Sequence, residues 1–432
     1  MKLRIKLIAL ILIISIISAY TIAVFAAGNE EDIIFASNDA QVFAAQDVMG
    51  KSVSQLKIQA NSAILLEGKT GKILYEMNAD DKKPPASITK VMTLLLVMEA
   101  LDTGKIHIDD KVTASAHASS MGGSQIWLEP DETMTVDELL RAAIIASAND
   151  ASVALAEHIS GSEEAFVDLM NKRAGELGMT NSSFKNACGL DEDGHLTTAR
   201  DIAIATKEVM KFDLITRYST VWMDTLRGGK TALNNTNKLV RFYKGCTGLK
   251  TGTTDGAKKC ISATASRNGL DLIAVTMGSE TSDERFDAAR KLFDYGFSNY
   301  SYFTPEIEKD KLTPVKVIKG KFNFVPVTIE KTDGLIIPKG REQDIETKIE
   351  FANDLQAPVE KGQNAGKVLF SLDGEAIAEI PIVTMIDVEK MTFANAYQLL
   401  IKMFFNFNYS ADCECQKGKE CNCIQNKGYC LC

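Results

Sequence analysis

The segment PPASITKVMTLLLVM, residues 84–98, contains a Ser-x-x-Lys pattern followed by a strongly apolar stretch. Its apolar side chains recur at the three- and four-residue spacing of one helix face: Ile88, Val91, Met92, Leu95 and Leu96. Pro85 and Ser87 suit the first turn of a helix, and Gly104 suits its end. We therefore predict a core helix from about Ser87 to Gly104.

Strand signals lie on both sides of this helix. Before it, residues 63–66 and 73–75 are short apolar runs around a Gly-Lys-Thr-Gly turn. Far behind it, residues 260–265 and 270–277 flank Asn268-Gly269, a strong hairpin signal. Strands at both ends of a helical stretch indicate one sheet that is completed late in the chain.

The stretch between these strands, from about 105 to 215, is predicted to be mainly helical. Thr135-x-x-Glu138 is a capping box that opens a helix with an apolar face. We expect Asn149 or Asp150 to cap the next helix.

The order of these elements predicts the architecture. A last helix is expected from Ser282 to Tyr295, with Gly296 as its end. Residues 56–302 then form an α+β domain, an antiparallel sheet flanked by helices with a mainly helical insert. From 303 to 390 the runs become short, β-rich and punctuated by Gly or Pro, which predicts a small all-β C-terminal domain.

The N-terminus has the pattern of a secretory signal peptide over residues 1–27. Lys2, Arg4 and Lys6 precede an apolar run that ends in small residues. The run is also long enough to span a bilayer, so cleavage and retention as an anchor both fit. Residues 28–55 are polar and are interpreted as a linker. In both cases we expect the chain after residue 27 to be exported, to the outer face of the cytoplasmic membrane or the cell wall.

A membrane-associating segment is predicted at residues 391–409. Phe393 to Phe407 is helix-compatible, rich in aromatic and aliphatic residues, and has Lys402 as its one charge. The stretch is too short to span a bilayer but fits an amphipathic helix in the membrane interface. The alternative is a helix packed on the β domain.

The tail at 410–432 concentrates six cysteines in three Cys-x-Cys pairs: Cys413, Cys415, Cys421, Cys423, Cys430 and Cys432. A disulfide within such a pair is strained, so bonds between pairs are expected in an oxidising setting. Thiolates at this spacing also suit Zn²⁺ or Cu(I). Disulfides, a metal site and a free unstructured tail therefore all stay open.

Composition narrows the classes of function. The net charge of -9 argues against nucleic acid as a partner, because phosphate binding needs clustered Lys and Arg. The histidines show no ligand spacing, so a zinc peptidase and a Ser-His-Asp triad have little support: His107, His117, His158 and His195. No cofactor is predicted.

Three patterns carry the chemistry, namely Ser87-Ile-Thr-Lys90, Ser147-Ala-Asn149 and Lys250-Thr-Gly252. Each is weak alone, because similar triplets recur at Ser54, Ser182, Lys69 and Ser266. The predicted secondary structure around each copy therefore decides which of them belongs to the site.

Ser87 is the copy at the start of a patterned helix. One turn places Lys90 on the same face, so its amine can reach the Ser87 hydroxyl. The helix N-terminus adds a positive field for a developing oxyanion. Burial and a neighbouring Lys250 would favour a neutral Lys90, which can act as a base.

Lys250-Thr251-Gly252-Thr253 falls on an expected strand before the Asn268-Gly269 hairpin. Such a strand can bind a peptide along its edge, while Lys250 and the Thr hydroxyls hold a carboxylate. The earlier copy at Lys69 falls in a tight turn. Ser147 and Asn149 lie between two helices, where a helix cap is the structural alternative.

With these motifs in this order, the sequence resembles the serine-type D-alanyl-D-alanine carboxypeptidases, the low-molecular-mass penicillin-binding proteins. Further similar segments are Lys69-Thr-Gly-Lys-Ile-Leu-Tyr-Glu76, Pro85 to Thr93 and Gly248-Leu-Lys-Thr-Gly-Thr-Thr254. The resemblance covers about residues 55–395 and implies a penicillin-binding/serine β-lactamase-like domain. It also implies peptidoglycan stem peptides and β-lactam antibiotics as partners, and a C-terminal membrane anchor.

The resemblance further implies a role for each site residue. Ser87 would be the acyl-ester nucleophile and Lys90 its base. Ser147 would relay protons, and the substrate would be held by Asn149, Lys250, Thr251, Gly252, Thr253 and Arg285. The backbone N–H groups of Ser87 and Thr253 would form the oxyanion hole. For Arg285 the alternative is a solvated residue in a first helical turn.

Two other functions stay open. A serine β-lactamase shares Ser-x-x-Lys and Lys-Thr-Gly, but it needs a deacylating Glu, and no Glu-x-x-x-Asn loop lies between Asn149 and Lys250. A surface or metal-binding protein with a vestigial catalytic domain is the alternative from another class, supported by the Cys-rich tail.

Overall fold

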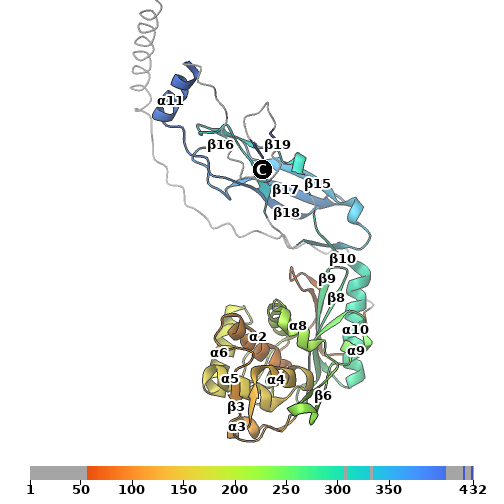
Figure 1. Cartoon of the computed structure of the whole chain (residues 1–432). Helices are drawn as coiled ribbons and strands as arrows, with labels where there is room; N and C mark the ends of the chain where they lie inside the picture. The colour runs from red at the N-terminus through yellow and green to blue at the C-terminus, as the bar shows by residue number, and fades with distance from the viewer. Residues whose placement is uncertain are drawn as a thin grey trace, which may run out of the picture. The chain divides into compact units, whose positions relative to one another are not determined.

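A computed structural model of the chain describes residues 56–305, 307, 309–330, 334–404, 422–423 and 430–431 (Figure 1). The expected signal peptide and linker lie outside these residues, as does Ser54. Of the tail cysteines, Cys423 and Cys430 lie within them, opposite each other in the ladder of β19 (Asn422–Cys423) and β20 (Cys430–Leu431).

A five-stranded antiparallel sheet with the order β2-β1-β9-β8-β7 organises the first folded part of the chain. Its strands are β1 (Ser62–Glu67), β2 (Ile73–Met77), β7 (Cys246–Thr254), β8 (Lys258–Arg267) and β9 (Leu270–Ser279). Asn268 and Gly269 both have positive φ, as a two-residue hairpin turn requires. The predicted hairpin and the late completion of the sheet are confirmed.

Both faces of the sheet are buried, and the alternation of the strands divides their side chains between two cores. Ile64 and Leu66 of β1 join the helical core, whereas Ala63 and Leu65 join the core under α10 (Ser282–Asn299). In Figure 1, α10 covers β8 and β9 on the side away from α2, α4 and α5.

Helix α10 is longer than predicted. It opens on a capping box of Thr281 and Glu284, but it runs through Gly296 to Asn299. Gly296 lies inside the helix, where its lack of a side chain allows close packing on the sheet. A Cβ there would lie 2.5 Å from a Leu272 methyl carbon and 3.1 Å from one of Leu65, so the helix approaches the sheet closely at this point.

The insert is mainly helical, as predicted. Its regular segments are α2 (Lys90–Asp102), α3 (Ala116–Ser119), α4 (Val136–Arg141), α5 (Asn149–Ser160), α6 (Glu163–Glu176), α7 (Ala199–Val209), α8 (Asp213–Ser219) and α9 (Leu239–Phe242). Two short hairpins accompany them: β3 (Lys111–Thr113) with β4 (Thr133–Thr135), and β5 (Met223–Leu226) with β6 (Thr231–Asn234). The capping box at Thr135 is present.

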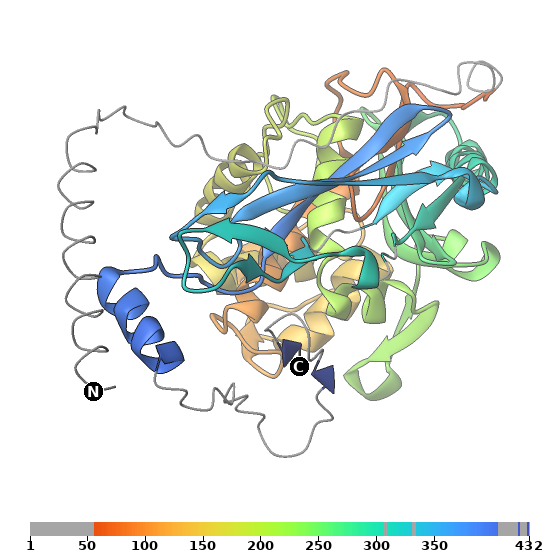
Figure 2. The ribbon, with the colours of Figure 1, turned by 90° about the horizontal axis from the view of Figure 1, so that it is seen from above.

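The C-terminal domain is all-β. Its strands are β11 (Val315–Ile318), β12 (Phe324–Val325), β13 (Val327–Ile329), β15 (Glu346–Phe351), β16 (Leu355–Gln356), β17 (Asn364–Leu372) and β18 (Glu375–Thr384). The long strands β17 and β18 run side by side in Figure 2. Their inward side chains form a separate apolar core with those of β11 and β13. The predicted α+β fold with an all-β C-terminal domain is confirmed.

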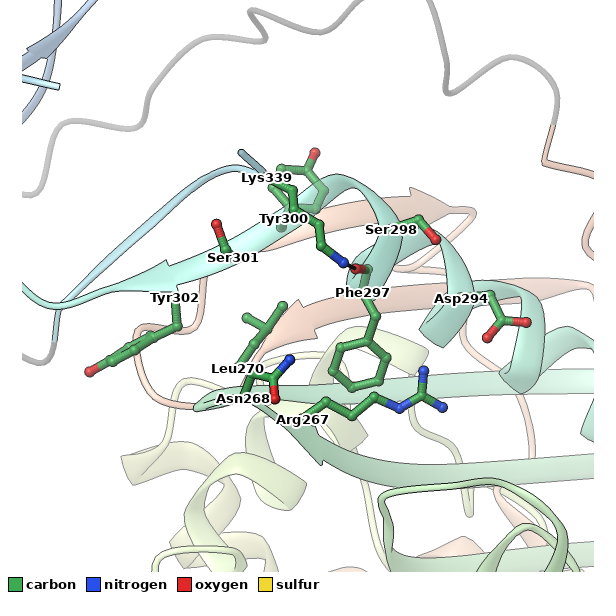
Figure 3. Close-up of a pocket in the computed structure, with 10 residues that line it drawn as sticks. All are labelled: Arg267, Asn268, Leu270, Asp294, Phe297, Ser298, Tyr300, Ser301, Tyr302 and Lys339. Carbon is green, nitrogen blue, oxygen red and sulfur yellow. Dashed lines mark hydrogen bonds between the residues drawn. The ribbon is translucent and has the colours of Figure 1, made fainter. Parts of the chain in front are cut away.

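A strand pair, β10 (Tyr300–Phe303) and β14 (Leu335–Pro338), connects the two folded parts. A pocket of about 270 Å³ lies beside it (Figure 3). There the Lys339 amine donates to the carbonyl oxygen of Phe297 at 2.6 Å, at the C-terminal turn of α10. The cation also suits the negative end of the helix dipole.

Helix α11 (Phe393–Phe404) follows the β domain. Within the described part of the chain, helices are too short or too polar to cross a membrane.

Candidate active site

Ser87 lies in a 3₁₀ turn, Ala86–Thr89, directly before α2. The sequence predicted an α-helix from Ser87, and the α-helix instead begins at Lys90. The turn is tight because Ala86 has a φ of 49° and packs under β7. Ser87 itself is half-buried, so its hydroxyl lies at the wall of the site.

The Lys90 amine is fully buried and touches three oxygen atoms. It lies 3.0 Å from Ser87 Oγ, 2.6 Å from Asn149 Oδ1 and 2.6 Å from the carbonyl oxygen of Cys188. A neutral amine has two N–H donors and one lone pair. The amide and carbonyl oxygens can only accept, so they take the two donors and leave the lone pair facing the Ser87 hydroxyl.

Burial lowers the pKa of Lys90 to about 8, against a smaller opposing effect of the nearby Cys188 and Asp150. Removing an ammonium ion from water disfavours its charged form. Lys90 is therefore neutral in a useful fraction of molecules near neutral pH, as a general base must be.

Ser147 is held by an irregular backbone. A π-helical turn, Ala142–Ala146, ends at Ser147, whose φ of 63° is left-handed. Such a conformation is uncommon for a residue with a side chain and clusters at functional sites. It brings the Ser147 hydroxyl to 2.6 Å from the Lys250 amine.

Asn149 and Asp150 do not cap α5 as predicted. The N-cap is Ala148, which has no capping side chain. The Asn149 amide instead bridges Lys90 and the carbonyl oxygen of Gly122, at 2.6 Å from each. The Asp150 carboxylate accepts the backbone N–H groups of a neighbouring loop, at Ile126 and Leu128. Both side chains therefore hold parts of the site in place instead of capping the helix.

Lys250 points inward from β7, the edge strand of the five-stranded sheet. Its amine donates to Ser147 Oγ and to the carbonyl oxygen of Thr251. Burial first, and then the positive charges of Lys90 and Arg285, place its pKa well below the usual value. A carboxylate arriving here would relieve that repulsion.

Gly252 explains why the last motif needs glycine. A Cβ at this position would lie 3.0 Å from Ala86 Cβ, Ile88 N and Pro85 O. The bare backbone lets β7 approach the Ser87 turn. Thr251, one residue earlier, is buried and bonds the hydroxyl of Thr236, while Thr253 is exposed at the edge.

Arg285 is buried rather than solvated, so that structural alternative is wrong. Its guanidinium donates to Gly252 O, Thr253 Oγ1, Cys260 O and Ser282 Oγ, and Nε is left without a partner. Burial lowers its pKa to about 10. No carboxylate of the described residues pairs with it, which leaves a cation next to the edge strand ready for an anionic ligand.

Two contributors to the site, Cys188 and Gly189, were missed from the sequence, and for a third, His195, a surface or loop position was preferred over one lining the cleft. Cys188 supplies a carbonyl oxygen to Lys90, and Gly189, with a φ of 91°, packs directly on Ala86. His195, treated as a loop or surface histidine, is buried and bonds Thr89 in the Ser87 turn. The available sequence signal was Gly189 itself, because glycine in a loop can adopt a positive φ and allow another backbone to approach closely.

The competing copies of the motifs lie elsewhere. Ser182 bonds the carboxylate of Asp201, and no lysine amine of the described residues contacts it. Lys69 is exposed in a turn, where it pairs with Asp271 at 3.4 Å. The structure thus brings together the copies chosen from context: Ser87, Lys90, Ser147, Asn149, Lys250 and Gly252.

We expect Lys250→Ala to slow acylation of Ser87 by one to two decades, and Lys69→Ala to leave it unchanged. Losing a charge-assisted contact to a substrate carboxylate costs about 1.5–3 kcal/mol, which is one to two decades in rate. The measurement is the second-order acylation rate of each variant. Equal effects of the two substitutions would contradict the assignment of the Lys-Thr-Gly motif.

This arrangement supports acyl transfer. A half-buried hydroxyl faces an amine of lowered pKa, a second hydroxyl can pass on a proton, and two basic side chains, Lys250 and Arg285, flank an edge strand. Such groups can form and break an ester through a serine.

Comparison with known proteins finds similar enzymes over most of the chain. The family D-alanyl-D-alanine carboxypeptidase matches residues 49–281, and the family Penicillin-binding protein 5, C-terminal domain, matches residues 300–390. The chain is 46% identical to the D-alanyl-D-alanine carboxypeptidase DacF of Bacillus subtilis, over 81% of this chain and 91% of that protein. It is 33% identical to DacC of Escherichia coli, over 88% and 95%.

Solved structures are similar as well. Penicillin binding protein 5 from Haemophilus influenzae superposes with a TM-score of 0.71 at 33% identity, covering 77% of this chain and 98% of that one. Penicillin-binding protein D2 from Listeria monocytogenes, in its cefotaxime-bound form, has a TM-score of 0.52 at 32% identity, covering 56% and 98%.

Proposed function

The chain belongs to the D-alanyl-D-alanine carboxypeptidase family, and we propose that it performs the family's reaction with Ser87 as nucleophile. The protein is a serine-type carboxypeptidase that removes the terminal D-alanine from peptidoglycan stem peptides and binds penicillin covalently. The observation that carries the assignment of Ser87 is the 3.0 Å contact between its hydroxyl and the buried Lys90 amine, whose other two contacts are oxygen atoms that can only accept.

The contacts of Lys90, Ser147 and Lys250 support the following acylation step. Lys90 takes the Ser87 proton as Oγ attacks the carbonyl carbon of the penultimate D-alanine. The backbone N–H groups of Ser87 and Thr253 stabilise the oxyanion, and Arg285 with Lys250 holds the terminal carboxylate. As the peptide bond breaks, a proton passes through Ser147 to the leaving D-alanine amine.

Deacylation completes the cycle. Water attacks the ester carbonyl, Lys90 accepts a proton from that water, and Ser87 Oγ leaves as the hydroxyl. The shortened stem peptide is then released. With penicillin the cleaved ring stays tethered to the acyl group, which hinders water and leaves the ester trapped.

The test is to incubate the enzyme with labelled penicillin, map the modified peptide, and measure D-alanine release from a peptide ending in D-alanyl-D-alanine. We expect a stable penicillin adduct on Ser87 and, without penicillin, catalytic release of one D-alanine per peptide cleaved. Rapid multiple turnover of penicillin without D-alanine release would instead indicate a β-lactamase.

We further propose that α11 holds the exported enzyme on the outer face of the cytoplasmic membrane. Phe393, Tyr397 and Leu400 are exposed and recur at the spacing of one helix face. The rings of Phe393 and Tyr397 stack at 6.3 Å between centroids, which makes a continuous apolar stripe. A helix with such a stripe lies in a membrane interface.

A chain of residues 28–390 is therefore expected to be fully soluble, whereas a chain of residues 28–432 sediments with membranes. The two chains should unfold at the same temperature, because exposed side chains of α11 add little to the fold. Sedimentation and thermal unfolding measure both. A large loss of thermal stability with unchanged sedimentation would favour a helix packed on the β domain.

A further inference from the structure

The β domain exposes an apolar patch that neither its core nor the active site uses. The hairpin patch consists of five side chains, each 42–57% exposed: Ile318, Phe322, Phe324, Met385 and Ile386. Clusters of exposed apolar side chains of this kind mark interaction sites in soluble domains.

Strand alternation places Phe324 and Met385 of the patch on the face opposite to the β-domain core. Val325 and Val327 are buried in the β-domain core, so Phe324 and Pro326 point to the opposite face. Met385 donates its N–H to the carbonyl oxygen of Pro326 at 2.9 Å, which places Met385 beside them.

Ile318 joins the same face through β11. Lys316 pairs with Phe324 across β11 and β12, and directly paired residues share a face. Ile318 lies two residues beyond Lys316, so it too points outward, in agreement with its exposure.

The hairpin of β11 and β12 packs tightly against the segment before α11, so the backbone that carries Phe322 and Phe324 is held in place. A Cβ at Gly320 would lie 2.8 Å from methyl carbons of Val317 and Val388. Lys321 N–H donates to Glu389 O at 2.8 Å, and Met391 N–H donates to Lys319 O at 2.7 Å. Met391 lies two residues before α11, so the patch and the start of α11 are joined by main-chain hydrogen bonds.

We propose that the hairpin patch is a second membrane contact, which places Phe322 and Phe324 in the interface of an anionic phospholipid surface. The occupant follows from continuity with α11 and from charge. Lys319 and Lys390 flank the patch and take part in no ion pair among the described residues, whereas Lys321 pairs with Glu389. Aromatic rings bordered by lysines suit such an interface. The inference rests on the proposed membrane role of α11.

The test compares chains of residues 28–432 for binding to vesicles of phosphatidylglycerol and phosphatidylcholine. The patch variant is Phe322→Ser with Phe324→Ser. The matched control is Phe351→Ser, an exposed phenylalanine of the same domain on β15. A third variant, Phe393→Ser with Leu400→Ser, removes the stripe of α11. Penicillin labelling and circular dichroism verify that each variant is folded.

We expect the patch variant to bind vesicles about tenfold more weakly than the parent and the control to bind equally. Hydrogen exchange at residues 318–324 and 385–390 should slow on vesicles. Equal binding and unchanged exchange, with the α11 variant impaired, would overturn the patch alone. An α11 variant that still binds like the parent would overturn the anchor itself, and so would a parent that binds no vesicles.

Discussion

Ser87→Ala is expected to abolish covalent labelling by penicillin and to reduce D-alanine release to background. The substitution removes the atom that forms the ester, and no other hydroxyl of the described residues lies within hydrogen-bonding distance of Lys90. The fold should be retained, because the hydroxyl is half-buried at the wall of the site. Mass spectrometry of the labelled enzyme and a D-alanine assay measure the loss, and thermal unfolding should shift by about 2 °C or less.

Ser182→Ala is the matched control, since Ser182 begins a second Ser-x-x-Lys pattern. Its hydroxyl bonds the Asp201 carboxylate and not a lysine, so labelling should be unchanged. Label recovered on Ser182 or Ser54 would refute the choice of nucleophile.

Lys90→Met is expected to slow acylation by about 10²–10⁴-fold, the usual contribution of a general base. Methionine has a similar length and needs no hydration, so it suits the buried position. It leaves Asn149 and the Cys188 carbonyl without a donor, but it keeps Ser87 in place. Stopped-flow acylation by penicillin measures the effect. A rate within a factor of five of the parent would remove Lys90 from the mechanism.

The pH dependence gives an independent test of the same role. Because the pKa of Lys90 is lowered to about 8, the fraction of neutral amine rises as pH rises through 8. Acylation by the parent should therefore increase tenfold per pH unit below about 8 and level off above it. Lys90→Arg keeps its proton throughout, so its residual rate should not show this rise. A parent rate that falls with pH across this range would contradict a neutral base.

The parts of this fold with local causes could be predicted from the sequence. The helical period after Ser87 and the Asn268-Gly269 turn depend on residues adjacent in the chain, and both features occur as expected. The choice of Lys250 over Lys69 also rested on local context, because one lies on a strand and the other in a turn.

What escaped prediction depends on residues distant in the chain. The burial of His195 is set by loops that approach it in space, and for Arg285 the residues alone left a solvated position open beside the site role that the resemblance implied. Gly296 looked like a helix end because its packing partner, Leu272, is invisible to any local pattern. The left-handed Ser147 likewise requires a π-helical turn that no sequence signal announces.

The position of β1 in the sheet has a consequence for biogenesis. Each of its residues pairs with β9, some two hundred residues later in the chain, so the central sheet cannot close until nearly the whole catalytic part has been made. Such non-local pairing slows folding, since the loop-closure entropy must be met before the contacts form. The export proposed above would use this delay, because a chain whose central sheet closes late stays unfolded for longer, as passage through a secretion channel requires, and its folding on the far side would then prevent its return.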